Sequence, residues 1–143
     1  MNIIVTGASR GIGYETVKQF TNEENNHILA ISRNEMKLQE LSEECKKTNT
    51  GSKTDIFPFD LEKINTDGER FMAQIEKTFD SVDILINNAG FLINRPFSEI
   101  TYQEALKILN VNYLSAAFLI KTLLPKLQES MHAHIVNISS MGA

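Results

Sequence analysis

The chain has 143 residues, of which 42% are hydrophobic and 22% are charged, and its formal net charge is −4. This length predicts one domain, residues 1–143, with a substantial core, and the composition is that of a globular protein and not of a disordered one. The negative charge excludes nucleic-acid binding of the kind that neutralises many phosphates.

The sequence also bears on the cellular compartment. Its single cysteine, Cys45, cannot form an internal disulfide and fits a reducing environment. The first residues, M-N-I-I-V-T-G, lack a cationic stretch followed by an apolar run, so no secretory signal is expected. No apolar run approaches the length of a membrane span. These features predict a cytoplasmic protein with no membrane partner.

Short apolar runs alternate with amphipathic segments from one end of the chain to the other. Apolar residues at helical spacing predict helices over Ile12–Phe20 and Glu35–Lys47. Two Thr-x-x-Glu sequences, beginning at Thr66 and Thr101, are typical of capping boxes and predict two more helices, the second reaching about Gln128. The apolar runs predict strands over Asn2–Thr6, His27–Ser32, Asp55–Phe59, Val82–Ile86 and His134–Ser139.

Strands that are apolar on both faces and alternate with helices pair in parallel, with helices covering both faces of the sheet. The expected fold is therefore α/β, a doubly wound parallel sheet. Because the sequence supplies five strands, we expect residues 134–139 to form a sheet edge that pairs only with residues 82–86. An unpaired apolar edge attracts another chain.

The first expected strand leads into the turn T-G-A-S-R-G-I-G, residues 6–13. Gly7 allows a tight exit from the strand, Gly11 lets the backbone approach a pyrophosphate, and Gly13 lets the next helix pack closely on the sheet. The free N–H groups at that helix start would face the anion. A turn without a ligand is the alternative interpretation of a glycine triplet alone, but the position between a strand and a helix favours a dinucleotide site.

The spacing G-x-x-x-G-x-G resembles the glycine motif of the short-chain dehydrogenase/reductase family. Further motifs follow in the family's order over the whole chain: Asp60-Leu61, N-N-A-G at residues 87–90, Asn112 with Pro125 in the long helix, and I-V-N-I-S-S ending at Ser140. The resemblance implies a Rossmann-type fold, truncated here after the fifth strand. It also implies hydride transfer between a nicotinamide and a carbonyl or alcohol substrate, and we expect a homo-oligomer.

The resemblance further implies site residues. Of the catalytic groups, Ser140 would orient the substrate oxygen and Asn112 would support the catalytic lysine through water. The family's tyrosine and lysine should lie beyond Ser140, so the 143-residue chain alone is expected to be inactive. The implied cofactor contacts are Gly7, Ser9, Arg10, Gly11, Ile12, Gly13, Arg33, Asp60, Leu61, Asn88, Ala89 and Gly90.

The end of the second expected strand is where such sites distinguish the two nicotinamide dinucleotides. An acidic residue there binds the ribose hydroxyls of NAD(H), but this chain has Ser32-Arg33-Asn34. Arg33 could bind a 2′-phosphate, and Arg10 could approach it from the glycine turn. Both could instead be solvated surface charges. Their convergence favours NADP(H) over NAD(H).

Two other patterns are weaker. Tyr14 and Lys18 have the Tyr-x-x-x-Lys spacing of the family's catalytic pair, but they belong to the first helix, where this spacing recurs by chance. His132 and His134 lack neighbouring ligands, so no metal site is expected.

A non-catalytic dinucleotide-sensing module is the main alternative to an oxidoreductase, and a structural domain without a ligand is a third. Ser140 and Asn112 favour the oxidoreductase, because a sensor needs neither.

Overall fold

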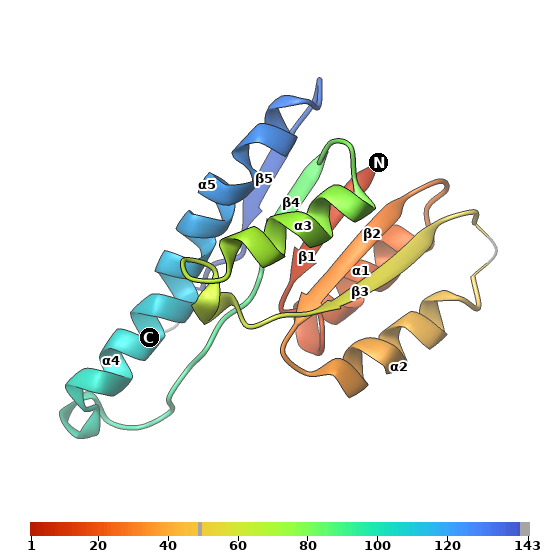
Figure 1. Cartoon of the computed structure of the whole chain (residues 1–143). Helices are drawn as coiled ribbons and strands as arrows, with labels where there is room; N and C mark the ends of the chain where they lie inside the picture. Colours follow the sequence, from red (N-terminus) through yellow and green to blue (C-terminus); the bar gives the residue numbers. More distant parts are fainter. Residues whose placement is uncertain (49, 141–143) are drawn as a thin grey trace.

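The computed structural model describes residues 1–48 and 50–140. They form one sheet in the order β3-β2-β1-β4-β5, and every pairing in it is parallel. Figure 1 shows the strands side by side with helices packed against them. The strands are β1 (Asn2–Thr6), β2 (His27–Ser32), β3 (Lys53–Pro58), β4 (Ile84–Asn87) and β5 (His134–Asn137). The doubly wound α/β fold is therefore confirmed.

Helices cover both faces of this sheet, and the alternation of β1 explains why. Ile3 and Val5 face a cluster formed with α1 and α2, whereas Ile4 faces a cluster formed with α3 and α5. All three side chains are fully buried, so the central strand is apolar at consecutive positions. The helical segments are α1 (Gly11–Thr21), α2 (Glu35–Cys45), the 3₁₀ turn η1 (Leu61–Lys63), α3 (Gly68–Thr78), the 3₁₀ turn η2 (Phe97–Glu99), α4 (Tyr102–Leu109), a π-helical turn (Asn110–Leu114) and α5 (Ser115–Gln128).

Some boundaries differ from the sequence-based expectation. β3 begins two residues early, at Lys53, because it pairs with β2 from that strand's first residue, His27. β4 begins at Ile84 instead of Val82. The Val82 N–H donates to the Lys126 carbonyl of α5 at 2.9 Å, so it is not available to the sheet.

The two expected capping boxes have different outcomes. At Thr101 the box is present: the hydroxyl accepts from the Glu104 N–H, and the Glu104 carboxylate accepts from the Thr101 N–H. The expectation at Thr66 is wrong. Its hydroxyl donates to the Lys63 carbonyl at 3.1 Å, which leaves α3 with Asp67 as an N-cap that makes no side-chain bond.

β5 ends at Asn137, two residues before the expected end, but the expectation that it forms a sheet edge is confirmed within the described chain. β5 pairs with β4 on one side, and nothing among residues 1–48 and 50–140 pairs with its other side. The exposed fractions of Ile135, Val136 and Ile138 are 42%, 40% and 43%. The apolar edge is therefore open to solvent.

One expectation about membranes needs correction. The continuous helical stretch Tyr102–Gln128 has 27 residues and contains an 18-residue window with a mean hydropathy of 1.3, 22% of which is buried, so it is long and apolar enough to cross a bilayer by length and composition alone. It was missed because its apolar residues are interrupted by polar ones and form no unbroken run. A core helix of a globular fold meets the same criteria, and Leu119, Leu123 and Leu127 of this stretch pack in the core.

Candidate functional site

The glycine turn after β1 is held to the end of β4 by side-chain hydrogen bonds. The Thr6 hydroxyl donates to the Ile86 carbonyl at 3.2 Å and accepts the N–H groups of Asn88 and Ala89 at 3.0 and 3.1 Å. In return, the Asn88 side-chain amide donates to the carbonyls of Thr6 and Gly7 at 3.0 and 3.4 Å. The turns after β1 and β4 therefore form one rigid unit at the carboxyl end of the sheet.

The glycines of the turn are required by this geometry. Gly7 and Gly11 have φ angles of +67° and +59°, which L side chains rarely adopt. A Cβ on Gly13 would lie 2.4 Å from Asn88 Nδ2 and 2.6 Å from the Gly7 carbonyl oxygen. A Cβ on Gly11 would meet nothing within 4 Å. The turn thus packs tightly behind Gly13 and leaves open space in front of Gly11, where a ligand can approach the backbone.

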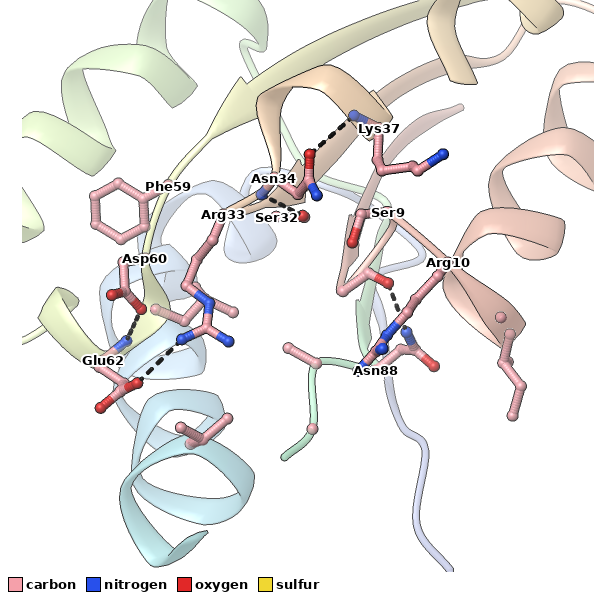
Figure 2. Close-up of a pocket in the computed structure, with 17 residues that line it drawn as sticks. Ser9, Arg10, Ser32, Arg33, Asn34, Lys37, Phe59, Asp60, Glu62 and Asn88 are labelled. Atoms are coloured by element: carbon pink, nitrogen blue, oxygen red, sulfur yellow. Dashed lines mark hydrogen bonds and ion pairs between the residues drawn. The ribbon is translucent and has the colours of Figure 1, made fainter. Parts of the chain in front are cut away.

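That open space belongs to a pocket of about 680 Å³ that spans the carboxyl ends of β1, β2, β3 and β4 (Figure 2). Every expected cofactor contact except Gly13 lines it: Gly7, Ser9, Arg10, Gly11, Ile12, Arg33, Asp60, Leu61, Asn88, Ala89 and Gly90. Gly13 lies behind the turn. The structure therefore brings these residues together, and their contact with a dinucleotide stays a prediction.

Several lining residues were not singled out from the sequence. They are Ser32, Asn34, Lys37, Phe59, Glu62 and Val111. A sequence signal existed for Asn34, which accepts the Lys37 N–H at 3.0 Å as the N-cap of α2. Glu62 directly follows the expected Asp60-Leu61 pair. No local pattern marks Lys37 or Val111 as pocket residues.

The charged side chains of the pocket come from opposite walls. Figure 2 shows Arg10 reaching in from the glycine turn and Arg33 from the end of β2. Arg33 pairs with Glu62 across 3.4 Å, and Lys37 pairs with Glu40 outside the pocket at 2.6 Å. Among the described residues, Arg10 has no ion-pair partner. The rim therefore carries cationic groups that a phosphate could bind.

Asn112, expected to be catalytic, lies in the π-helical turn between α4 and α5. Its side chain makes two hydrogen bonds to the backbone of one residue: Oδ1 accepts the Phe91 N–H at 2.7 Å, and Nδ2 donates to the Phe91 carbonyl at 3.0 Å. Asn112 thus fixes the chain just after Gly90, which lines the pocket. In this structure its side chain is a positioning group, and π-turns of this kind are frequent at functional sites.

Ser140 follows β5, so it lies beyond the carboxyl end of the strand next to β4, and it is exposed. The two strands are joined at this end by a 2.9 Å hydrogen bond from Asn87 Nδ2 to Asn137 Oδ1. Ser140 therefore lies at the same end of the sheet as the pocket, the carboxyl end of the strands. Its catalytic role stays a prediction.

Tyr14 and Lys18 lie on α1 facing α2, at its contact with Glu44. Lys18 Nζ is 3.1 Å from Glu44 Oε2 and 5.5 Å from the centre of the Tyr14 ring. Burial, together with the hydrogen bond to Glu44, raises the pKa of Tyr14. A proton donor needs a lower pKa, nearer the working pH. The geometry thus gives this pair a structural role.

Of the two histidines of interest, His134 begins β5 and His132 lies in the turn before it. His134 Nδ1 is 2.7 Å from the His132 carbonyl, so the ring contacts the backbone. Within residues 1–48 and 50–140, no group of three or more His, Cys, Asp or Glu side chains could hold a metal ion.

Comparison with known proteins identifies the architecture around this pocket. A family model described as short chain dehydrogenase matches residues 1–143, the whole chain. The chain belongs to the short-chain dehydrogenase family. Its members bind a nicotinamide dinucleotide, and the open space in front of Gly11 beneath a cationic rim fits such a group.

Individual relatives and a solved structure point to the same family. The chain is 33% identical over 141 residues to a fatty acyl-CoA reductase of Acinetobacter baylyi, covering 97% of this chain and 46% of the relative. It is 35% identical over 141 residues to the mouse dehydrogenase/reductase SDR family member 7B, covering 97% and 43%. An oxidoreductase structure from Escherichia coli superposes with a TM-score of 0.85 at 28% identity, covering 98% and 57%. The short-chain dehydrogenase chain described here therefore spans about half the length of the relatives it matches.

Proposed function

We propose that this short-chain dehydrogenase is an oxidoreductase that uses NADP(H) in preference to NAD(H). The observation that carries the proposal is the placement of Arg10 and Arg33 on opposite walls of one pocket, with no carboxylate at the end of β2. A 2′-phosphate between them would receive charge-assisted hydrogen bonds from both sides. Asp60 and Leu61, at the same end of the pocket, are the proposed contacts of the adenine.

The bound cofactor would supply the hydride chemistry between its nicotinamide and a carbonyl or alcohol. The protein's own part is positional. The turns after β1 and β4 would hold the pyrophosphate and the nicotinamide side of the cofactor. Ser140 would donate a hydrogen bond to the substrate oxygen, and Asn112 would keep the segment after Gly90 in place through Phe91.

Turnover by the 143-residue chain alone is not expected. Its only Tyr-x-x-x-Lys spacing is Tyr14 with Lys18, and that pair contacts Glu44 of α2, outside the pocket. Incubation with NADPH or NADH and a panel of aldehydes and ketones should give no protein-dependent oxidation. Oxidation above background that disappears in Tyr14→Phe would show that this assignment of the pair is wrong.

Cofactor preference is tested by titrating NADPH and NADH into the parent and into Arg33→Asp. One charge-assisted hydrogen bond contributes about 1.5–3 kcal/mol, so the parent should bind NADPH roughly ten- to a hundredfold more tightly than NADH. Arg33→Asp should reverse this order. Lys47→Asp, the same charge change at an exposed site outside the pocket, should leave it unchanged. Equal affinities for both cofactors in the parent would contradict the proposal.

We also propose a cytoplasmic homo-oligomer. Exposed apolar side chains along the α4–α5 stretch support association: Leu109, Tyr113, Phe118 and Leu124. Sedimentation of the purified chain should show a species larger than the monomer, and a monomer at all concentrations would contradict the proposal.

A further inference from the structure

Arg33, proposed above as a phosphate ligand, already has an anionic partner in the structure. Its Nη1 lies 3.4 Å from Glu62 Oε1, and the side chains of Arg33 and Glu62 are 56% and 29% exposed. Figure 2 shows one guanidinium nitrogen of Arg33 directed toward Glu62. The ion pair joins the end of β2 to η1, and both residues line the pocket. It therefore crosses the region where the adenosine end of a dinucleotide would lie.

The fold fixes Glu62 in this place. Asp60 is the N-cap of η1, and its Oδ1 accepts the Glu62 N–H at 3.2 Å. Leu61, between them, is buried in the core cluster beside α3 and α5. The backbone that carries Glu62 is thus held from both sides. The position of η1 therefore places the Glu62 carboxylate at the pocket.

We propose that Glu62 is a specificity-determining residue that competes with the 2′-phosphate for Arg33 and so weakens the binding of NADP(H) but not of NAD(H). The inference rests on the proposed function. A phosphate monoester carries about −1.5 to −2 charges at pH 7. To bind Arg33 it must displace the Glu62 carboxylate or lie beside it against like-charge repulsion. The hydroxyl of an NAD(H) ribose carries no charge and meets neither cost.

The test is a titration of NADPH and NADH into the parent, Glu62→Gln and Glu62→Ala, with thermal unfolding to verify that each variant is folded. An exposed ion pair contributes little, so removing the competitor should lower the Kd for NADPH about two- to fivefold. The Kd for NADH should not change. Two variants are used so that the loss of one to misfolding leaves the other. Glu76→Gln, the same charge change on the exposed side of α3, should alter neither Kd.

A double-mutant cycle identifies the route of the effect. In an Arg33→Ala background, Glu62→Gln should no longer tighten NADPH binding, because the group for which Glu62 competes is gone. An equal gain in that background, an unchanged Kd in the Glu62 variants, or weaker binding of NADPH would each overturn the inference.

Failure of the proposed function gives a different pattern: a parent without preference for NADPH whose Kd is also insensitive to Arg33→Ala. The inference about Glu62 would fall with it. A parent that prefers NADPH through Arg33 but ignores Glu62→Gln would overturn the inference alone.

Discussion

The two ends of the sheet are built from the same strands, but their charged side chains differ in how fully they are paired. At the amino end, Asp55 accepts from His27 Nε2 and Lys53 Nζ at 2.8 and 2.7 Å, and Asp83 accepts from the Asn2 N–H and the Ser130 hydroxyl, both at 2.7 Å. At the carboxyl end, Arg10 has no ion-pair partner among the described residues. The paired charges at the amino end stabilise the fold, whereas at the carboxyl end Arg33 is paired with Glu62 and Arg10 is left to bind a ligand.

The pKa directions fit this division. Burial raises the pKa of Asp55, but its hydrogen bonds to Lys53 and His27 outweigh burial and leave the pKa below its ordinary value. Burial also raises the pKa of Asp83, but the hydrogen bonds from the Ser130 hydroxyl and the Asn2 backbone outweigh it and leave the pKa below its ordinary value. Substitutions at the amino end should therefore change stability, and those at the carboxyl end should change binding.

The largest effect is expected at Gly13. This residue does not follow the division between the two ends, because its packing affects both stability and nucleotide binding. Gly13→Ala would place a Cβ against Asn88 Nδ2 and the Gly7 carbonyl, and overpacking of this kind costs about 1–3 kcal/mol. Denaturant unfolding should show that loss, and nucleotide affinity should fall with it because the turn must shift. Gly68→Ala, which meets nothing within 4 Å at the start of α3, should be neutral or stabilising. Equal behaviour of the two variants would contradict the packing argument.

At the amino end, Asp83→Ala should destabilise without affecting binding. It removes the acceptor of a backbone N–H in β1 and of the Ser130 hydroxyl, at a cost of about 1–3 kcal/mol. The free energy of unfolding measures the loss, and a NADPH titration under native conditions should give the parent Kd. Asp80→Ala, an exposed acid in the same loop, serves as the control. A changed Kd in Asp83→Ala would show that the two ends are coupled.

Acid should weaken the same end. The lowered pKa values of Asp55 and Asp83 mean that their contribution to stability is complete above the unfolded value of about 3.9 and is lost as pH falls through the lower folded values. Unfolding free energy should therefore decline below about pH 4, and less steeply in Asp55→Asn and Asp83→Asn. A parent and variants with parallel acid profiles would contradict this assignment.

The smallest effect is expected at Tyr14. Tyr14→Phe removes a hydroxyl that contacts Glu44 of α2 outside the pocket, so stability should change by less than about 0.5 kcal/mol. NADPH affinity should equal that of the parent. A loss of binding would place Tyr14 in the site after all, and the titration decides the matter directly.

The sequence predicted the fold because the fold depends on local patterns, whereas most of the residues that line the pocket were implied by the family resemblance, and their contact with a dinucleotide stays a prediction. Apolar strands, glycine spacing and strand-end polar residues each report on their immediate surroundings. The ion pair of Arg33 was not predictable, since Glu62 is 29 residues away and the two meet only when β2 and β3 pair. The two hydrogen bonds between the Asn112 side chain and the Phe91 backbone likewise depend on a π-helical turn that no local sequence pattern predicts.

Thr66 and Thr101 show the same limit at close range. Both begin a Thr-x-x-Glu sequence, but only Thr101 follows a segment that leaves its hydroxyl available. The turn Leu61–Lys63 precedes Thr66, and the Lys63 carbonyl takes its hydroxyl and its N–H. The Thr-x-x-Glu motif alone does not show that the Lys63 carbonyl, three residues upstream, competes for the Thr66 hydroxyl.

The hydrogen bonds between Thr6 and the turn after β4 also have a consequence for biosynthesis. Asn88 lies 82 residues after Thr6, and ribosomes add about 5–20 residues per second. After the glycine turn has been made, roughly 4–16 s therefore pass before the partner that holds it is made, by the same rate. A nascent chain that has formed β1 and β2 cannot yet present an ordered phosphate site. Nucleotide binding during translation would thus report that β4 has docked beside β1.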